Sequence, residues 1–160
     1  MLSLSFTQLR SDRLAGMAVR VLRDEGIQRA SISLALVDNA TIQRINREHL
    51  GHDWPTDVIS FVLSDPDEPV LAGEVIVSAE MARTTAADVA ADPWAELSLY
   101  VIHGLLHLCG YDDATDEAAR LMRAREERAL RQEGLTNTFR LDCPAGRTEA
   151  ERGRAECSGH

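Results

Sequence analysis

Two histidines and an acid occupy one short stretch, residues 103–113, with a spacing typical of a metal site. An apolar run without proline predicts that the stretch begins as a largely buried helix, which continues to about residue 109. His103 and His107 are four residues apart, so both imidazoles project from one helical face and can reach a single ion. Gly110 can end the helix in the left-handed conformation, which lets the chain bring Asp113 toward the histidines. We therefore predict that His103, His107 and Asp113 bind one metal ion.

The spacing H-x3-H-x2-G-x2-D differs at two positions from a zinc-binding pattern of metalloproteases, H-E-x-x-H-x-x-G-x-x-H. Gly104 replaces the glutamate that acts as general base in those enzymes, so peptide hydrolysis by that route is not expected. Asp113 replaces the third histidine, and a carboxylate is an ordinary zinc ligand. Three protein ligands leave one coordination position open, which is typical of a catalytic zinc site rather than a structural one.

Each of these residues also has a structural interpretation. Histidines on an apolar helix are often packed in the core without a ligand, although a pair four residues apart followed by an acid favours metal binding. Asp112 and Asp113 both precede a helix predicted to begin near Thr115, where an acid can act as a helix-terminal residue, and either could be the carboxylate ligand. Because two imidazoles and one acid also suit Fe(II), the residues alone leave the metal open.

Other polar residues could lie near such a site: His49, His52, Thr56, Asp57, Ser60 and Cys109. The two histidines could support the mouth of a metal site, but exposed histidines at a helix end are the simpler interpretation. The threonine, aspartate and serine lie beside a turn at Pro55, where short polar side chains often satisfy backbone groups. Their alternative role is to line a groove near the metal. The cysteine would point away from the face shared by the histidines, which favours a buried structural thiol.

Composition and charge limit the function classes. A chain of 160 residues, 44% of them hydrophobic, is long enough for one domain with a single core. Its formal net charge of −9 argues against a protein that coats RNA non-specifically, because phosphate contacts need clustered cations. Three cysteines without disulfide-like spacing, no secretion signal and no apolar run of about 18 residues predict a cytoplasmic protein that does not span a membrane.

Hydrophobic periodicity predicts four strands and about five helices. The expected strands span residues 2–6, 31–37, 58–62 and 73–79, and the expected helices span residues 11–25, 38–50, 79–91, 93–109 and 115–133. On the last helix, arginines alternate with Glu126, Glu127 and Glu133, which is typical of a solvated face. We predict a single domain over residues 1–133. The polar, aperiodic stretch 134–160 is predicted to be a flexible C-terminal extension.

Three separated motifs make the chain similar to the YbeY family: HGLLHLCGYDD at residues 103–113, DWPTDVISF at residues 53–61 and GEVIVS at residues 73–78. The resemblance covers about residues 1–133 in the order of the elements. It implies a zincin-like α+β fold, in which we expect a mixed four-stranded sheet packed with the helices. It also places Asp113, rather than Asp112, at the ligand position.

The YbeY family consists of bacterial zinc-dependent endoribonucleases that are also described as rRNA maturation factors. The resemblance therefore implies single-strand-specific RNA cleavage in 16S rRNA 3′ end processing and in ribosome quality control. It implies ribosomal RNA as substrate and ribosomal proteins as candidate partners. One zinc ion per chain is expected, with iron or nickel as other divalent metals that such a site accepts.

Two departures from the family pattern affect what the resemblance implies. The family usually has a third histidine where this chain has Asp113, and usually an arginine where this chain has Leu50. The first change keeps a metal ligand, whereas the second removes a cation. Metal binding thus carries over more directly than cleavage. The alternative function is a ribosome-associated RNA-processing factor with a structural metal and little catalysis of its own.

Overall fold

The structure, a computed structural model, describes residues 2–6, by their backbone alone, and residues 11–135. The elements in chain order are β1 (Leu2–Phe6), α1 (Ser11–Asp24), β2 (Ala30–Val37), α2 (Asn39–Leu50), β3 (Val58–Val62), β4 (Leu71–Ser78), α3 (Ala79–Asp88), α4 (Pro93–Leu108) and α5 (Asp116–Gln132). The predicted α+β class and the five helices are confirmed. Residues 136–160, nearly all of the predicted extension, lie outside the described residues.

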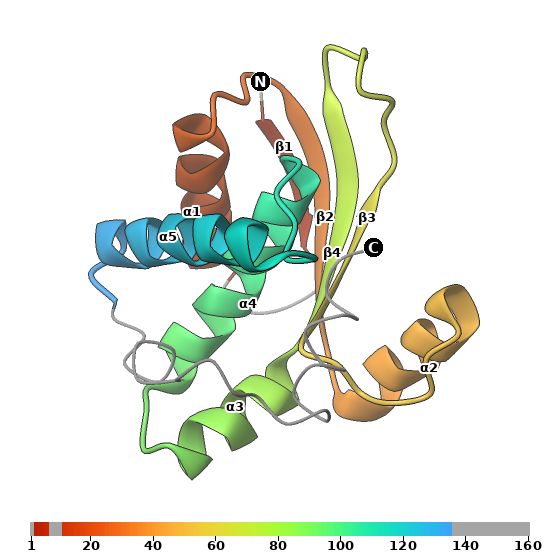
Figure 1. Ribbon diagram of the computed structural model, residues 1–160, viewed down its shortest axis with the longest axis vertical. Coiled ribbons are helices and arrows are strands. Elements are labelled where there is room, and N and C mark those ends of the chain that lie inside the picture. Colours follow the sequence, from red (N-terminus) through yellow and green to blue (C-terminus); the bar gives the residue numbers. More distant parts are fainter. Residues whose placement is uncertain (1, 7–10, 136–160) are drawn as a thin grey trace.

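The strands form one mixed sheet in the order β1-β2-β4-β3 (Figure 1). β1, β2 and β4 are parallel, whereas β3 pairs antiparallel with β4 and places Ser60 opposite Val75 and Phe61 opposite Glu74. Among the described residues no strand pairs with the outer side of β3, which is therefore an open edge. Helices α1, α4 and α5 lie on one face of the sheet, and α2 lies on the other (Figure 1).

Short polar residues begin the helices that position the candidate site. The Asp38 carboxylate accepts a hydrogen bond from the Thr41 backbone N–H (2.8 Å) at the start of α2, and Gly51 ends that helix with φ 72°. At the start of α4, the Asp92 carboxylate accepts one from the Trp94 N–H (3.0 Å), and a proline occupies the first turn. The Asp92 cap and the proline define where α4 begins, and hence which of its residues face the sheet.

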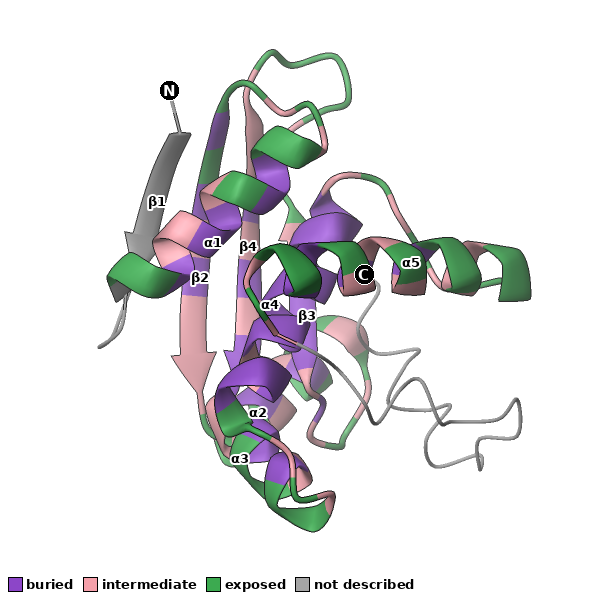
Figure 2. Ribbon diagram, turned by 90° about the vertical axis from the view of Figure 1, so that its left-hand side faces the viewer, coloured by how far each residue is buried: buried purple, intermediate pink, exposed green. Residues whose placement is uncertain are grey.

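Helix α4 is the centre of the core. Of its 16 residues, 14 are buried, because α1, α3, α5 and the sheet pack around it. Figure 2 shows it as a mainly buried helix between the outer helices and the strands. Leu105 and Leu106 are each 1% exposed, and Val75 and Val77 on β4 are fully buried. A helix that is apolar on nearly every side is stable only in such surroundings, so any polar residue on it is enclosed by protein.

Gly104 allows α4 to approach the sheet closely. A Cβ atom at this position would lie 2.6 Å from Val75 Cγ1, 3.0 Å from Val58 Cγ2 and 3.0 Å from Ser60 Oγ. The Ser60 hydroxyl also donates a hydrogen bond to the Gly104 carbonyl (3.0 Å). This contact explains why the position that carries glutamate in metalloproteases is glycine here: a larger side chain would push the helix off β3 and β4.

We predict that Gly104→Ala lowers the free energy of unfolding by about 1–3 kcal/mol, because its methyl group overpacks the helix–sheet contact. Gly16→Ala on α1 is the matched control. There, the nearest heavy atom to the added carbon is the far end of the exposed Arg20 side chain at 3.1 Å, which can shift slightly together with its partner Glu133. Urea unfolding should show the control unchanged or stabilised by up to about 1 kcal/mol. Equal stability of the two variants would contradict the close-approach argument.

Candidate metal centre

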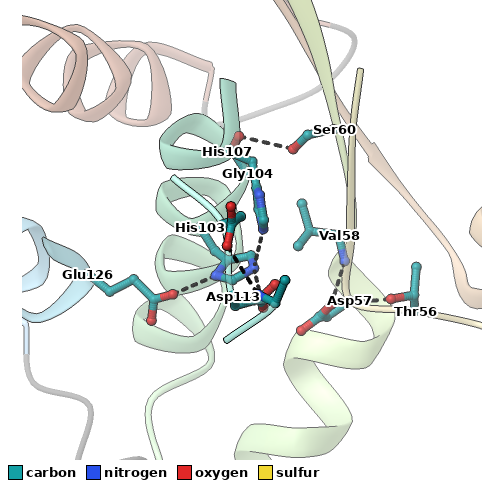
Figure 3. Close-up of polar contacts among 11 residues, drawn as sticks. Thr56, Asp57, Val58, Ser60, His103, Gly104, His107, Asp113 and Glu126 are labelled. Atoms are coloured by element: carbon teal, nitrogen blue, oxygen red, sulfur yellow. Dashed lines mark hydrogen bonds and ion pairs between the residues drawn. The ribbon is translucent and has the colours of Figure 1, made fainter. Parts of the chain in front are cut away.

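Residues His103, His107 and Asp113 lie together, with ligand atoms all within 4.8 Å of one another. The Nε2 atoms of the two histidines are 3.0 Å apart, and His103 Nε2 is 3.8 Å from Asp113 Oδ2. Figure 3 shows the three side chains converging beside α4. A tetrahedral ion with ligands at about 2.0–2.2 Å holds their atoms roughly 3.3–3.6 Å apart. These residues therefore fit such an ion with only small movements.

The turn after α4 brings the acid to the histidines. Gly110 adopts φ 101°, a left-handed conformation, and its backbone N–H donates to the His107 carbonyl (3.1 Å). The chain then reverses, so that Asp113 lies against His103. Asp112 is exposed and instead accepts a hydrogen bond from the Ala114 N–H (3.2 Å). The geometry thus favours Asp113 over Asp112 as the carboxylate ligand.

The candidate site is buried, and burial disfavours the charged forms of its side chains. His103 and His107 are 5% and 9% exposed. Burial, with a further contribution from His103, lowers the pKa of His107 to about 4, so its imidazole is neutral at pH 7. Burial also raises the pKa of Asp113, although His103 opposes that shift. A neutral imidazole is the form that binds a metal, and a cation would compensate the buried carboxylate.

A fourth residue, Glu126 on α5, completes the centre, and the sequence interpretation assigned it to a solvated face. That assignment is wrong: the side chain is 2% exposed, and Oε1 lies 2.5 Å from His103 Nδ1 (Figure 3). With a proton on Nδ1, the imidazole donates to the carboxylate, which leaves the Nε2 lone pair directed at the site. The signal was helical spacing, since Glu126 lies on the same buried stripe as Met122, Ala129 and Leu130.

The remaining candidates lie outside the group that could hold an ion. The ring of His52 lies tilted against that of Trp54 with centroids 4.6 Å apart, and His49 meets Phe61 edge-on at 5.7 Å. Cys109 is partly buried, and burial raises its pKa to about 12, so it remains a thiol. His49 is exposed, as its structural interpretation expects, whereas His52 and Cys109 are both partly buried.

The turn before β3 satisfies its own polar groups and also lies near the candidate site. The Asp57 carboxylate accepts from the Val58 N–H (2.8 Å) and from the Thr56 hydroxyl (3.3 Å), as expected for residues that satisfy a turn. Figure 3 nevertheless shows this carboxylate on the side of β3 that faces Asp113. Its negative charge is one of the causes that raise the pKa of Asp113. Asp57 therefore contributes to the electrostatics of the candidate site.

Comparison with known proteins identifies the family. The chain matches the family described as Endoribonuclease YbeY over residues 5–134. It belongs to the YbeY endoribonuclease family. The relative named Endoribonuclease YbeY in Rhodopirellula baltica is 41% identical over 138 residues, which cover 84% of this chain and 71% of the relative. The protein of that name in Carboxydothermus hydrogenoformans is 40% identical over 114 residues, covering 71% of this chain and 79% of the relative.

A solved structure supports the fold assignment. The solution structure of TM1509 from Thermotoga maritima superposes with a TM-score of 0.59, and the match covers 92% of this chain and all of that chain. At 24% sequence identity, the likeness concerns the fold alone. The family that the three sequence motifs predict is therefore confirmed.

We predict that Glu126→Gln lowers zinc affinity by about 10- to 100-fold, because the amide no longer provides a carboxylate acceptor for His103. Affinity can be measured by competition with a fluorescent zinc chelator. Glu127→Gln, at the neighbouring acid, which is less buried and outside the group that could hold an ion, is the matched control and should bind zinc normally. Unchanged affinity in Glu126→Gln would show that the buried carboxylate does not position His103.

We predict opposite effects of Asp113→Asn on stability and metal binding. Because the pKa of Asp113 is raised, its ionised form destabilises the metal-free fold at neutral pH, and the neutral amide removes that effect. In the presence of chelator, the variant should melt at a higher temperature than the unchanged protein at pH 7. The gap should narrow as the pH is lowered, because Asp113 itself then becomes protonated.

The same variant should bind zinc at least about 10-fold more weakly, since it loses an anionic ligand. Asp112→Asn is the control, because its carboxylate only supports the turn. A larger loss of zinc affinity in Asp112→Asn than in Asp113→Asn would show that Asp112 is the ligand and would contradict this prediction.

Proposed function

We propose that this protein is a zinc-dependent endoribonuclease that cleaves single-stranded RNA, acting in rRNA maturation at the 16S rRNA 3′ end and in ribosome quality control. The observation that carries the proposal is the convergence of His103, His107 and Asp113 in one buried group. Membership of the YbeY family, whose relatives are named endoribonucleases, supports the reaction class. We propose further that the fold is zincin-like and that residues 1–133 form the single domain.

The donor set fits zinc. Two neutral imidazoles and one carboxylate are an ordinary catalytic zinc set, and they also accept iron or nickel. Bound there, zinc would supply Lewis acidity toward a phosphate oxygen of the RNA. Aspartate in place of a third histidine lowers the formal charge of the site by one, which weakens that Lewis acidity relative to an all-histidine site.

The protein's own residues arrange the reaction. Glu126 fixes the His103 ring and keeps a proton on Nδ1, so that Nε2 faces the site. The low pKa of His107 keeps that imidazole neutral at working pH. Gly104 excludes a glutamate from the position of a protease general base. The arrangement is therefore suited to holding an ion against a phosphodiester and lacks the proton acceptor of peptide hydrolysis at that position.

The net charge of the protein favours RNA binding at one local site over RNA binding along a general basic surface. The net charge is −9, and Leu50 occupies the place where the family usually has an arginine. These two observations favour the second candidate, a ribosome-associated factor that keeps the metal for structure. In either case, binding to ribosomal RNA or ribosomal proteins would bring the chain to its substrate. No helix within the described residues is long and apolar enough to cross a membrane, and we propose a cytoplasmic location.

We predict that His103→Ala loses bound zinc and loses RNA cleavage together. Elemental analysis of the purified protein and a cleavage assay on a single-stranded oligoribonucleotide measure the two effects. His52→Ala is the matched control, because His52 lies outside the metal-binding group. Cleavage by the unchanged protein should stop with chelator and return with added zinc. A zinc-free His103→Ala protein that still cuts RNA would contradict the nuclease proposal, and zinc-replete protein that never cuts would favour the binding factor.

A further inference from the structure

A groove of about 710 Å³ begins at the candidate metal centre. His107 lines one part of it, and Ser60, Phe61, His49, Glu74 and Ile76 line other parts. Its volume is within the range of sites that hold small ligands, roughly 300–1,000 Å³. The motif GEVIVS of residues 73–78, which contains Glu74 and Ile76, has no part in binding the ion. The groove gives that motif a candidate role.

The groove reaches both sides of strand β3. Successive side chains of a strand point to opposite faces, so Ser60 lies on the α4 side and Phe61 on the α2 side. The Ser60 hydrogen bond to Gly104 and the edge-on contact of Phe61 with His49 of α2 agree with this alternation. Because β3 is an open edge of the sheet, a chain bound at the metal centre can pass around it into the groove.

The chemistry of the groove suits a base rather than a phosphate. Glu74 is its one carboxylate, and none of the described residues that line it is an arginine, so a phosphate would be repelled there. Glu74 lies opposite Phe61 in the sheet register, next to an aromatic ring. Within residues 11–135, the structure gives its side chain no hydrogen bond or ion pair. A flat apolar ring that carries N–H donors matches this combination.

We propose that the groove binds a guanine base of single-stranded RNA, adjacent to the phosphate held at the metal centre. Glu74 accepts hydrogen bonds from the guanine N1–H and 2-amino group, and the base packs in the corner between Phe61 and His49. Guanine presents two neighbouring donors to a carboxylate, whereas adenine and cytosine present one amino group beside a ring acceptor. Uracil presents one N–H between two carbonyl oxygens that Glu74 would repel. The inference rests on the part of the proposed function that brings single-stranded RNA to the metal centre, whether or not that RNA is then cleaved.

The test uses zinc-loaded protein and four fluorescein-labelled 2′-O-methyl oligonucleotides, which resist cleavage. Each is a ten-residue uridine strand with G, A, C or U at one central position, and binding is followed by fluorescence anisotropy. We expect the guanine strand to bind about 10-fold or more tightly than the all-uridine strand. Glu74→Gln should reduce that preference to about two-fold or less. Glu48→Gln, an exposed acid on α2 outside the groove, should leave it intact.

A parallel cleavage assay on the matching unmodified RNA separates the two proposals. Equal affinity for the four strands, or a guanine preference that Glu74→Gln leaves unchanged, would overturn the base site even where cleavage is zinc-dependent. A guanine preference that is lost in Glu74→Gln supports the base site. If the unchanged protein shows that preference but no chelator-sensitive cleavage, the base site stands and the nuclease proposal fails.

Discussion

The close contact between helix α4 and the sheet at Gly104 is the constraint on which the rest of the structure depends. It brings the helix to within van der Waals distance of Val58 and Val75, and it surrounds the histidines with protein. The same contact excludes a side chain from the position where metalloproteases have their general base. One steric requirement therefore both encloses the candidate metal centre and separates its chemistry from peptide hydrolysis.

Burial of carboxylates in this site costs free energy, and a bound cation would offset that cost. The imidazoles of His103 and His107 and the carboxylates of Asp113 and Glu126 lie within one partly or fully buried region, and Asp57 adds negative charge at its border. Without a cation, the fold carries this arrangement at a cost in stability, as the raised pKa of Asp113 shows. A divalent ion would join the acids and imidazoles into one compensated unit. This balance accounts for the charged groups that are buried at this site.

Much of this could be predicted from the sequence, because strong periodicity and polar caps mark the elements. The helices predicted over residues 38–50 and 93–109 correspond closely to α2 and α4, and the spacing of His103 and His107 predicts their shared face. Glu126 was missed because its neighbours along the chain are charged, although its helical spacing from Met122 and Leu130 places it on the buried stripe of α5. The groove at β3 could not be predicted either, since it depends on which strand forms the sheet edge.

An acidic protein can act on RNA in this way, because its affinity would come from one ion and one groove and would need no general basic surface. This requires that His103, His107 and Asp113 hold that ion. A crystal structure of the zinc-loaded protein, with an anomalous difference map at the zinc edge, tests it most directly. We expect one peak about 2.0–2.2 Å from Nε2 of both histidines and from an Asp113 oxygen. A zinc peak elsewhere, with the two imidazoles packed unchanged around no ion, would contradict the account.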